Sequence, residues 1–143
     1  MTQNLDADTI ERMLAEARAA AENAYAPYSR FPVGACVMTS DGNLVRGANI
    51  ENASYPLGTC AERVAVNTAA ANGVRTIVAV AVSAPRAFRA SPCGGCRQVL
   101  NEFKPSADPM TVILDGVEGP LVTTLDALLP EAFGPRDLEP SST

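Results

Sequence analysis

Histidine is absent from this 143-residue chain. The absence excludes a Ser-His-Asp triad, a Cys-His dyad and any metal site rich in imidazole ligands. The chain does contain four cysteines. The question that the sequence raises is therefore what these thiols do without a histidine beside them.

Positive charge and long apolar segments are also scarce. The chain has 11 Lys and Arg against 16 Asp and Glu, a formal net charge of -5, so nothing indicates the basic face that nucleic acids bind. No apolar run approaches the roughly 20 residues that cross a bilayer. The first segment, MTQNLDADTIER, is polar and acidic, whereas a signal peptide would be basic and then apolar. We therefore expect a cytoplasmic protein that binds a small molecule and has no nucleic-acid or membrane partner.

The length and composition fit a single domain. With 47% hydrophobic residues, the chain can bury one sizeable core, and no internal repeat or low-complexity segment divides it. We expect one domain over residues 1–143, which ends in a polar tail at about residues 134–143.

Apolar residues at helical spacing predict four helices. The first runs from about Asp8, with Glu11 completing a capping pattern, and ends before Pro27. The second starts near Cys60 and is closed by Gly73. For the third, we expect Ser91 as the N-cap and Pro92 as the first helical residue. A short closing helix is predicted in LDALLP.

The strand predictions come from apolar runs and turn signals. PVGACVMTSDGNLVRGANI predicts two strands joined by a turn at Asp41 and Gly42. The apolar run at residues 76–82 predicts a buried strand, and MTVILD and VEGPLVTTL predict two more. Strands that alternate with helices indicate an α/β sandwich with a mixed sheet.

Three of the cysteines fall at the predicted starts of helices. Cys60 stands two residues before Glu62, and two glycines separate Cys93 from Cys96. In a reducing compartment this spacing is typical of metal ligands or redox thiols rather than of structural disulfides. A helix N-terminus lowers the pKa of a thiol and so prepares it as a ligand. Because catalytic zinc sites have three protein ligands and structural sites have four, the three cysteines favour a catalytic zinc.

Each of these assignments has a plainer alternative. Cys36 is a possible fourth ligand of a closed structural site, although its place between Ala35 and Val37 in a predicted strand favours a small buried residue. Glu62 is equally well explained, on spacing alone, as the third residue of a capping box opened by Thr59. The Cys93–Cys96 pair also fits a redox dithiol, but the intervening glycines and the upstream cysteine fit a metal better.

The motifs resemble those of the small zinc-dependent cytidine deaminases. Zinc deaminases have a His or Cys two residues before a catalytic Glu, and then P-C-x-x-C; here these read Cys60-Ala61-Glu62 and Pro92-Cys93-Gly94-Gly95-Cys96. The resemblance covers nearly the whole chain, through YAPYSRFPVGA, NIENASY, CAERVA, SPCGGCRQVL and LLPEAFGP. It implies a three-layer α/β/α sandwich around a five-stranded mixed sheet. One departure is Ala48, where many members of the family have a cysteine.

The resemblance also implies a function and a role for each matching residue. The reaction would be hydrolytic deamination of cytidine and deoxycytidine in pyrimidine salvage, by a homotetramer with one zinc ion per subunit. Glu62 would shuttle protons, and Arg63 would donate hydrogen bonds to the thiolates. The residues implied in zinc ligation are Cys60, Cys93 and Cys96, and those implied in substrate binding are Phe31, Asn49, Glu51, Ala61 and Phe133, the last reaching a neighbour's site.

Other functions stay open on the sequence alone. A structural zinc module would need four ligands and a protein partner, and a thiol redox enzyme would work without metal. Within the deaminases, the substrate could instead be another aminated nucleoside or an antibiotic analogue.

Overall fold

The computed structural model describes residues 5–139 and has a five-stranded mixed sheet in the order β2-β1-β3-β4-β5. The strands are β1 (Gly34–Thr39), β2 (Leu44–Ala48), β3 (Ile77–Ser83), β4 (Thr111–Leu114) and β5 (Leu121–Thr124). Strands β3 and β4 are parallel, and the other neighbouring pairs are antiparallel. The hairpin predicted at Asp41 and Gly42 is confirmed, with Gly42 at φ 86° in its turn.

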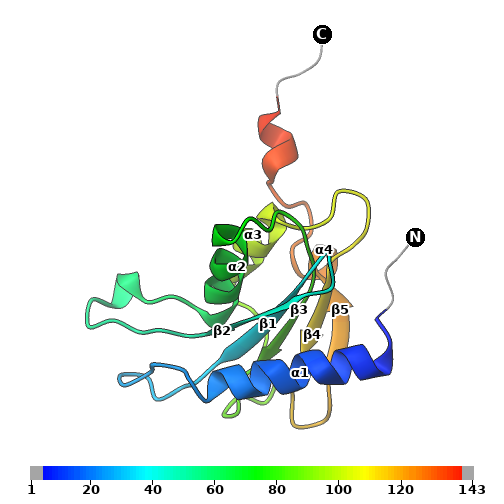
Figure 1. Cartoon of the computed structure of the whole chain (residues 1–143). Helices are drawn as coiled ribbons and strands as arrows, with labels where there is room; N and C mark the ends of the chain where they lie inside the picture. Colours follow the sequence, from blue (N-terminus) through cyan, green and yellow to red (C-terminus); the bar gives the residue numbers. More distant parts are fainter. Residues whose placement is uncertain (1–4, 140–143) are drawn as a thin grey trace.

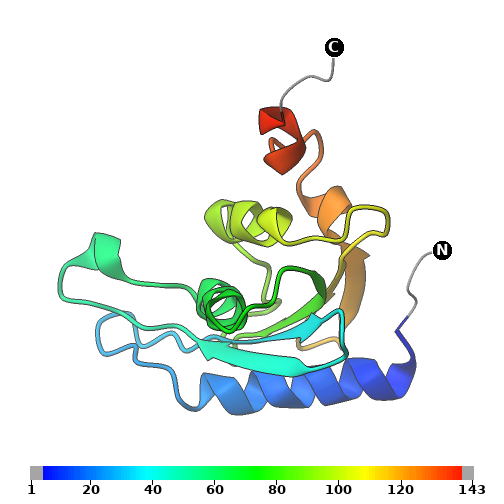
Figure 2. The same ribbon diagram turned by 45° about the horizontal axis from the view of Figure 1, so that its top comes forward.

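The helices lie on both faces of the sheet, as Figures 1 and 2 show. They are α1 (Ala7–Ala21), α2 (Ala61–Ala71), α3 (Gly94–Glu102) and α4 (Leu125–Leu128), with short 3-10 turns at Tyr55–Leu57 and Pro135–Leu138. Helix α1 covers one face, whereas α2 and α3 cover the other (Figure 2). A separate buried apolar cluster fills each interface, so the predicted α/β sandwich is confirmed.

The predicted start of α1 was two residues too late. The helix begins at Ala7, and its N-cap is Asp6, whose carboxylate accepts a hydrogen bond of 2.8 Å from the Thr9 amide. The helix also ends at Ala21, several residues before Pro27. Both aspartates are residues that favour an N-cap position, and Asp6 is the one whose side chain accepts from the first turn, whereas Asp8 lies inside the helix.

The start of α3 also differs from the prediction. Its N-cap is Cys93, and Ser91 and Pro92 form an extended entry. The guanidinium of Arg97 donates to the Ser91 hydroxyl at 3.0 Å and to the Pro92 carbonyl at 2.8 Å. The Ser91 oxygen is therefore committed to a side chain and does not cap the helix.

Helix α2 lies unusually close to the sheet. A Cβ atom on Gly47, in β2, would overlap the carbonyl oxygen of Ala61 and the amide nitrogen of Ala65. Because only a glycine permits this approach, Gly47 sets the position of the first turn of α2. The end of α2 matches its prediction, since Gly73 follows it with φ at 94°.

The two ends of the chain bear on earlier expectations. None of the helices within residues 5–139 is long and apolar enough to cross a membrane. Part of the expected tail forms the 3-10 turn Pro135–Leu138, and residues 140–143 lie outside the described range, as do residues 1–4 at the start of the acidic N-terminal segment.

Candidate active site and metal centre

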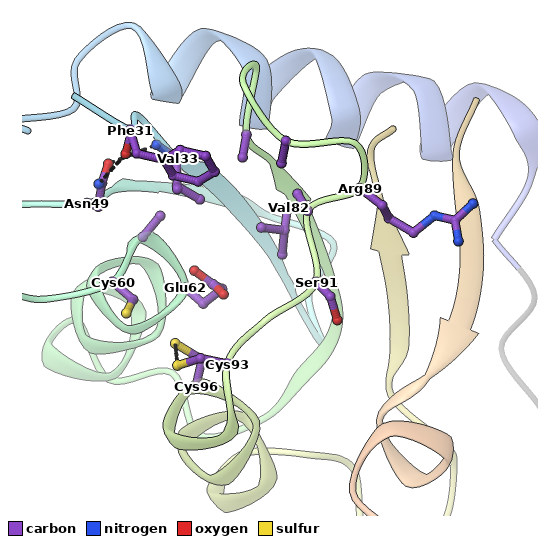
Figure 3. Close-up of a pocket in the computed structure, with 14 residues that line it drawn as sticks. Phe31, Val33, Asn49, Cys60, Glu62, Val82, Arg89, Ser91, Cys93 and Cys96 are labelled. Atoms are coloured by element: carbon purple, nitrogen blue, oxygen red, sulfur yellow. Dashed lines mark hydrogen bonds between the residues drawn. The ribbon is translucent and has the colours of Figure 1, made fainter. Parts of the chain in front are cut away.

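Three cysteines meet where the N-termini of α2 and α3 converge (Figure 3). Cys60 is the N-cap of α2, Cys93 is the N-cap of α3, and Cys96 lies in the first turn of α3. Their Sγ atoms are all within 4.8 Å of one another, and those of Cys93 and Cys96 are 3.2 Å apart. Within residues 5–139, this is the group of side chains able to hold a metal ion.

The donor set fits zinc. Burial and the nearby Glu62 carboxylate raise the pKa of the Cys96 thiol, whereas the Cys96 backbone amide lowers the pKa of the Cys93 thiol. Several thiolates this close together repel one another unless a cation neutralises them. Soft thiolate ligands favour Zn(II) over harder cations such as Mg(II). Three such ligands would leave one coordination position for water or substrate.

Arg63 lies beside the thiols. Its Nη2 atom is 3.6 Å from the Cys60 Sγ and 3.5 Å from the Gly58 carbonyl oxygen. The hydrogen bond to the Cys60 side chain is the main cause of the raised pKa of the guanidinium. A cation here offsets part of the negative charge that three thiolates bring to the centre.

Glu62 is buried in the same cavity. It is 4% exposed and lies in the first turn of α2, and desolvation raises the pKa of its carboxyl group. The capping-box alternative is wrong, because Cys60 occupies the N-cap and Thr59 instead pairs with Ile50. In Figure 3 the Glu62 carboxyl group lies between the cysteines and the open part of the cavity, where it can exchange protons with a bound molecule.

The cavity beside these groups has a volume of about 270 Å³, close to the lower end of the roughly 300–1,000 Å³ typical of small-molecule sites. Phe31 lines this cavity and is 38% exposed, so it does not belong to the core. Ala61 also lines the cavity and is fully buried. The lining residues are Phe31, Val33, Asn49, Cys60, Ala61, Glu62, Val82, Ala84, Ala87, Arg89, Ala90, Ser91, Cys93 and Cys96.

The two expected ribose ligands lie apart. Asn49 lines the cavity, and its amide group accepts from the Val33 amide at 2.8 Å and donates to the Phe31 carbonyl at 2.9 Å. Glu51 instead lines a neighbouring cavity of about 370 Å³ and accepts hydrogen bonds from the Tyr28 and Ser29 amides. In this structure both side chains therefore brace the segment that carries Phe31.

Phe133 and Cys36 lie outside the cavity. Phe133 is 59% exposed, and its carbonyl oxygen accepts hydrogen bonds from Gln98 and Asn101 on α3. Cys36 is fully buried in β1, in the cluster on the α1 face of the sheet. Cys36 is therefore no fourth ligand of the metal centre, and the closed structural site is wrong.

Sequence reasoning missed one side of the cavity. Residues 84–91, called the wall segment below, contribute Ala84, Ala87, Arg89, Ala90 and Ser91 to its lining. Apart from Ser91, which begins SPCGGCRQVL, they belong to no motif, and their side chains are mostly small or exposed. The available signal was positional, because this segment connects a buried strand to the P-C-G-G-C motif.

The fold and the site define a zinc-binding α/β protein in which three cysteines are positioned to hold a metal ion, with a buried carboxyl group beside a small-molecule cavity. Residues 7–111 match the family model described as the cytidine and deoxycytidylate deaminase zinc-binding region. The chain belongs to this cytidine and deoxycytidylate deaminase family.

The chain is similar to known relatives over most of their length. The chain is 45% identical to a cytidine deaminase of Sporosarcina psychrophila over 130 residues, which are 90% of this chain and 94% of the relative. Among solved structures, a cytidine deaminase from Burkholderia pseudomallei aligns with a TM-score of 0.79 at 43% identity, over 86% of this chain and 98% of its own. A cytidine deaminase from Mycobacterium tuberculosis aligns with a TM-score of 0.76 at 38% identity, over 92% of this chain and 99% of its own.

Proposed function

We propose that this protein is a zinc-dependent deaminase that hydrolyses cytidine and deoxycytidine to uridine and deoxyuridine with release of ammonia. The observation that carries the proposal is the convergence of Cys60, Cys93 and Cys96 with the buried Glu62 on one cavity. Membership of the deaminase family supports the same reaction. A structural zinc module and a metal-free redox enzyme both fit this arrangement less well, because neither needs the carboxylate.

Cys60, Cys93 and Cys96 would hold one zinc ion per subunit. Bound there, zinc supplies a Lewis acid that makes water a nucleophile near neutral pH. The chain's own contribution is to orient the three sulfur atoms from two helix N-termini and to offset their charge with Arg63.

Glu62 would carry the protons of the reaction. It takes one proton from the attacking water and delivers it to N3 of the pyrimidine, which makes C4 more electrophilic. It then passes the second water proton to the departing amine, so that the oxygen stays on C4 and ammonia leaves. Burial raises the pKa of the Glu62 carboxyl group toward neutral pH. This direction suits a group that both accepts and donates a proton.

The cavity lining supports a set of substrate contacts. The ring of Phe31 would stack on the pyrimidine, and the backbone of Ala61 would contact the base. Asn49 and Glu51 would bind the ribose hydroxyl groups. Glu51 would have to reach the substrate from the neighbouring cavity, with its second carboxylate oxygen, since Oε1 accepts the Tyr28 and Ser29 amides.

A homotetramer is part of the proposal. Large apolar side chains project from two adjacent segments, in which Tyr25 pairs with Ile50 and the rings of Tyr28 and Tyr55 are 5.8 Å apart. Exposed apolar surface of this kind is typical of protein contacts. We define the apolar surface as Tyr25, Tyr28, Ile50, Tyr55 and Leu57. Assembly through it would also give the exposed Phe133 a neighbouring subunit to reach.

The cellular setting follows from the reaction. We place the enzyme in the cytoplasm, in pyrimidine salvage, as one domain over residues 1–143 with its polar tail at about 134–143. Its substrates are small nucleosides rather than nucleic acids, in keeping with the net charge of -5.

The deciding experiment measures ammonia and uridine from cytidine with the purified, zinc-loaded protein and with Glu62→Gln. We expect turnover by the parent and a loss of about 10²- to 10⁴-fold or more in the variant, because one carboxylate carries both proton transfers. Zinc content and the circular dichroism spectrum should match in the two proteins.

Two results would contradict the proposal. A folded, zinc-loaded parent that leaves cytidine and deoxycytidine unchanged would rule out these substrates. Near-parental turnover by Glu62→Gln would rule out the proton role of Glu62 while leaving the metal site intact.

A further inference from the structure

The wall segment has no role in the mechanism above, yet its position matters to the site. It supplies five residues of the cavity lining and leads directly to Cys93. In Figure 3 it lies across the cavity from Phe31. No helix or strand contains it, so its position depends on bonds to the rest of the molecule.

Asp115 holds this segment through its backbone. The Ala90 amide donates to the Asp115 carbonyl at 3.0 Å, and the Asp115 amide donates to the Val82 carbonyl at 2.9 Å. Val82 and Ala90 both line the cavity. A bridge between Arg89 and Gly116 continues the same pairing by one residue on each side.

The carboxylate of Asp115 is itself fixed from three directions. One oxygen accepts from Arg18 Nε at 2.9 Å and from the Ser83 hydroxyl at 2.7 Å. The other accepts from Arg18 Nη2 at 2.9 Å and from the Gly116 amide at 3.1 Å. The Asp115 side chain is only 17% exposed, and the Arg18 guanidinium holds the pKa of its carboxyl group below the usual value.

These bonds connect the two faces of the molecule. Arg18 belongs to α1, which lies on the face of the sheet opposite α2 and α3 (Figure 2). A bidentate Arg–carboxylate pair fixes both the distance and the orientation of its partners. Through Asp115, helix α1 therefore anchors a segment that borders the cavity.

We propose that Asp115 is a positioning residue for substrate binding: its carboxylate, held by Arg18 and Ser83, fixes the wall segment and with it the width of the cavity facing Phe31. Where this segment is free to move, only a fraction of molecules present a closed cavity, and apparent affinity falls by that fraction. Glu62, which would transfer the protons, is held by α2 and not by the wall segment, although both line the cavity. Loss of the anchor should therefore change KM much more than kcat.

The test is Asp115→Asn, which keeps the size of the side chain and removes its charge. We expect KM for cytidine to rise about three- to tenfold, with kcat within twofold of the parent and an unchanged zinc content. The matched control is Asp126→Asn, which breaks the 3.0 Å ion pair with Lys104 at α4. Neither residue of that pair lines the cavity, so the control should keep the parental KM.

A role confined to stability would give a different result, namely a lower melting temperature with a parental KM at temperatures well below it. That result overturns the inference. Ser83→Ala removes a single bond to the carboxylate and should raise KM to a smaller extent. It provides the same test if Asp115→Asn does not fold.

The KM test rests on the proposed function, because it needs turnover of cytidine. A second measurement does not depend on turnover. Hydrogen exchange of peptides that cover residues 84–91 should be faster in Asp115→Asn and parental in Asp126→Asn. Parental exchange in Asp115→Asn overturns the inference. If the parent fails to deaminate cytidine, the proposed function is wrong, and this measurement still tests the anchor.

Discussion

At the scale of single residues, the four cysteines divide by position rather than by chemistry. Cys60, Cys93 and Cys96 converge at two helix N-termini, whereas Cys36 lies in β1 and is buried in the cluster on the α1 face of the sheet. Burial raises the pKa of the Cys36 thiol to about 12, so at neutral pH it is a small apolar group. Only the clustered thiols combine ligand chemistry with access to the cavity.

Cys36→Ala tests this division. Zinc content and turnover should both stay within twofold of the parent, because the side chain lies in the cluster on the α1 face of the sheet. Stability should fall by about 1 kcal/mol from the small cavity that is left. Metal analysis and denaturant unfolding measure the two effects, and a loss of zinc would restore Cys36 as a candidate ligand.

The metal site is also where the sequence was most informative about single residues. The spacing of Cys60, Glu62 and the C-G-G-C pair placed all four side chains correctly at helix starts, because such short motifs depend on local geometry. Asn49 and Glu51 were harder, since each bonds to the backbone of a segment about 16 to 23 residues away in the chain. No local pattern reports a partner at that distance.

At the scale of elements, the contact between β2 and α2 controls the site from outside it. Gly47 lies under the turn that carries Ala61 and leads from Cys60 to Glu62. Backbone atoms, unlike a flexible side chain, have no alternative rotamer with which to make room for a Cβ. The fit of these two elements therefore sets where Cys60 and the Glu62 carboxyl group lie.

Gly47→Ala should consequently affect both stability and metal binding. We expect a loss of about 3 kcal/mol, at the upper end for overpacking, and faster zinc release to a competing chelator. Gly95→Ala is the matched control, because a Cβ there meets no atom within 4 Å, and alanine is favoured over glycine inside a helix. Equal stability of the two variants would show that α2 can shift without cost.

Most element boundaries could be predicted, and their errors have physical causes. The strands followed from apolar runs and the hairpin from its turn residues. The caps of α1 and α3 were misassigned because Asp6 competes with Asp8, and because Arg97 takes the Ser91 hydroxyl. The strand order was not accessible to patterns, since it depends on pairings such as that of β1 with β3 across the intervening β2 and α2.

At the scale of the whole molecule, the apolar surface defined above stays exposed to solvent in a single subunit. Leu57 is 68% exposed and follows Tyr55 in a turn that projects from the sheet at the left of Figure 1. In the proposed homotetramer such side chains would be buried between subunits. An acidic residue there would then carry an unpaired charge into the contact.

Leu57→Asp is therefore expected to weaken assembly. Sedimentation of the parent should give a tetramer, and the variant should give a smaller species at the same concentration. Val117→Asp, at a residue 71% exposed on the turn between β4 and β5, should keep the parental mass. A parent that sediments as a monomer would contradict the tetramer while leaving the zinc site untested by that result.

The position of β3 in the chain also affects the order in which the three clustered cysteines become available. On a ribosome, Cys60 and α2 emerge before β3, and Cys93 and Cys96 emerge only after it. The strand that lies beside β1 thus separates the first of the three clustered cysteines from the other two in the chain. Until Cys93 and Cys96 have emerged, a nascent chain has one of the three thiols without its companions, so the group of three cannot assemble before about two thirds of the chain has been made.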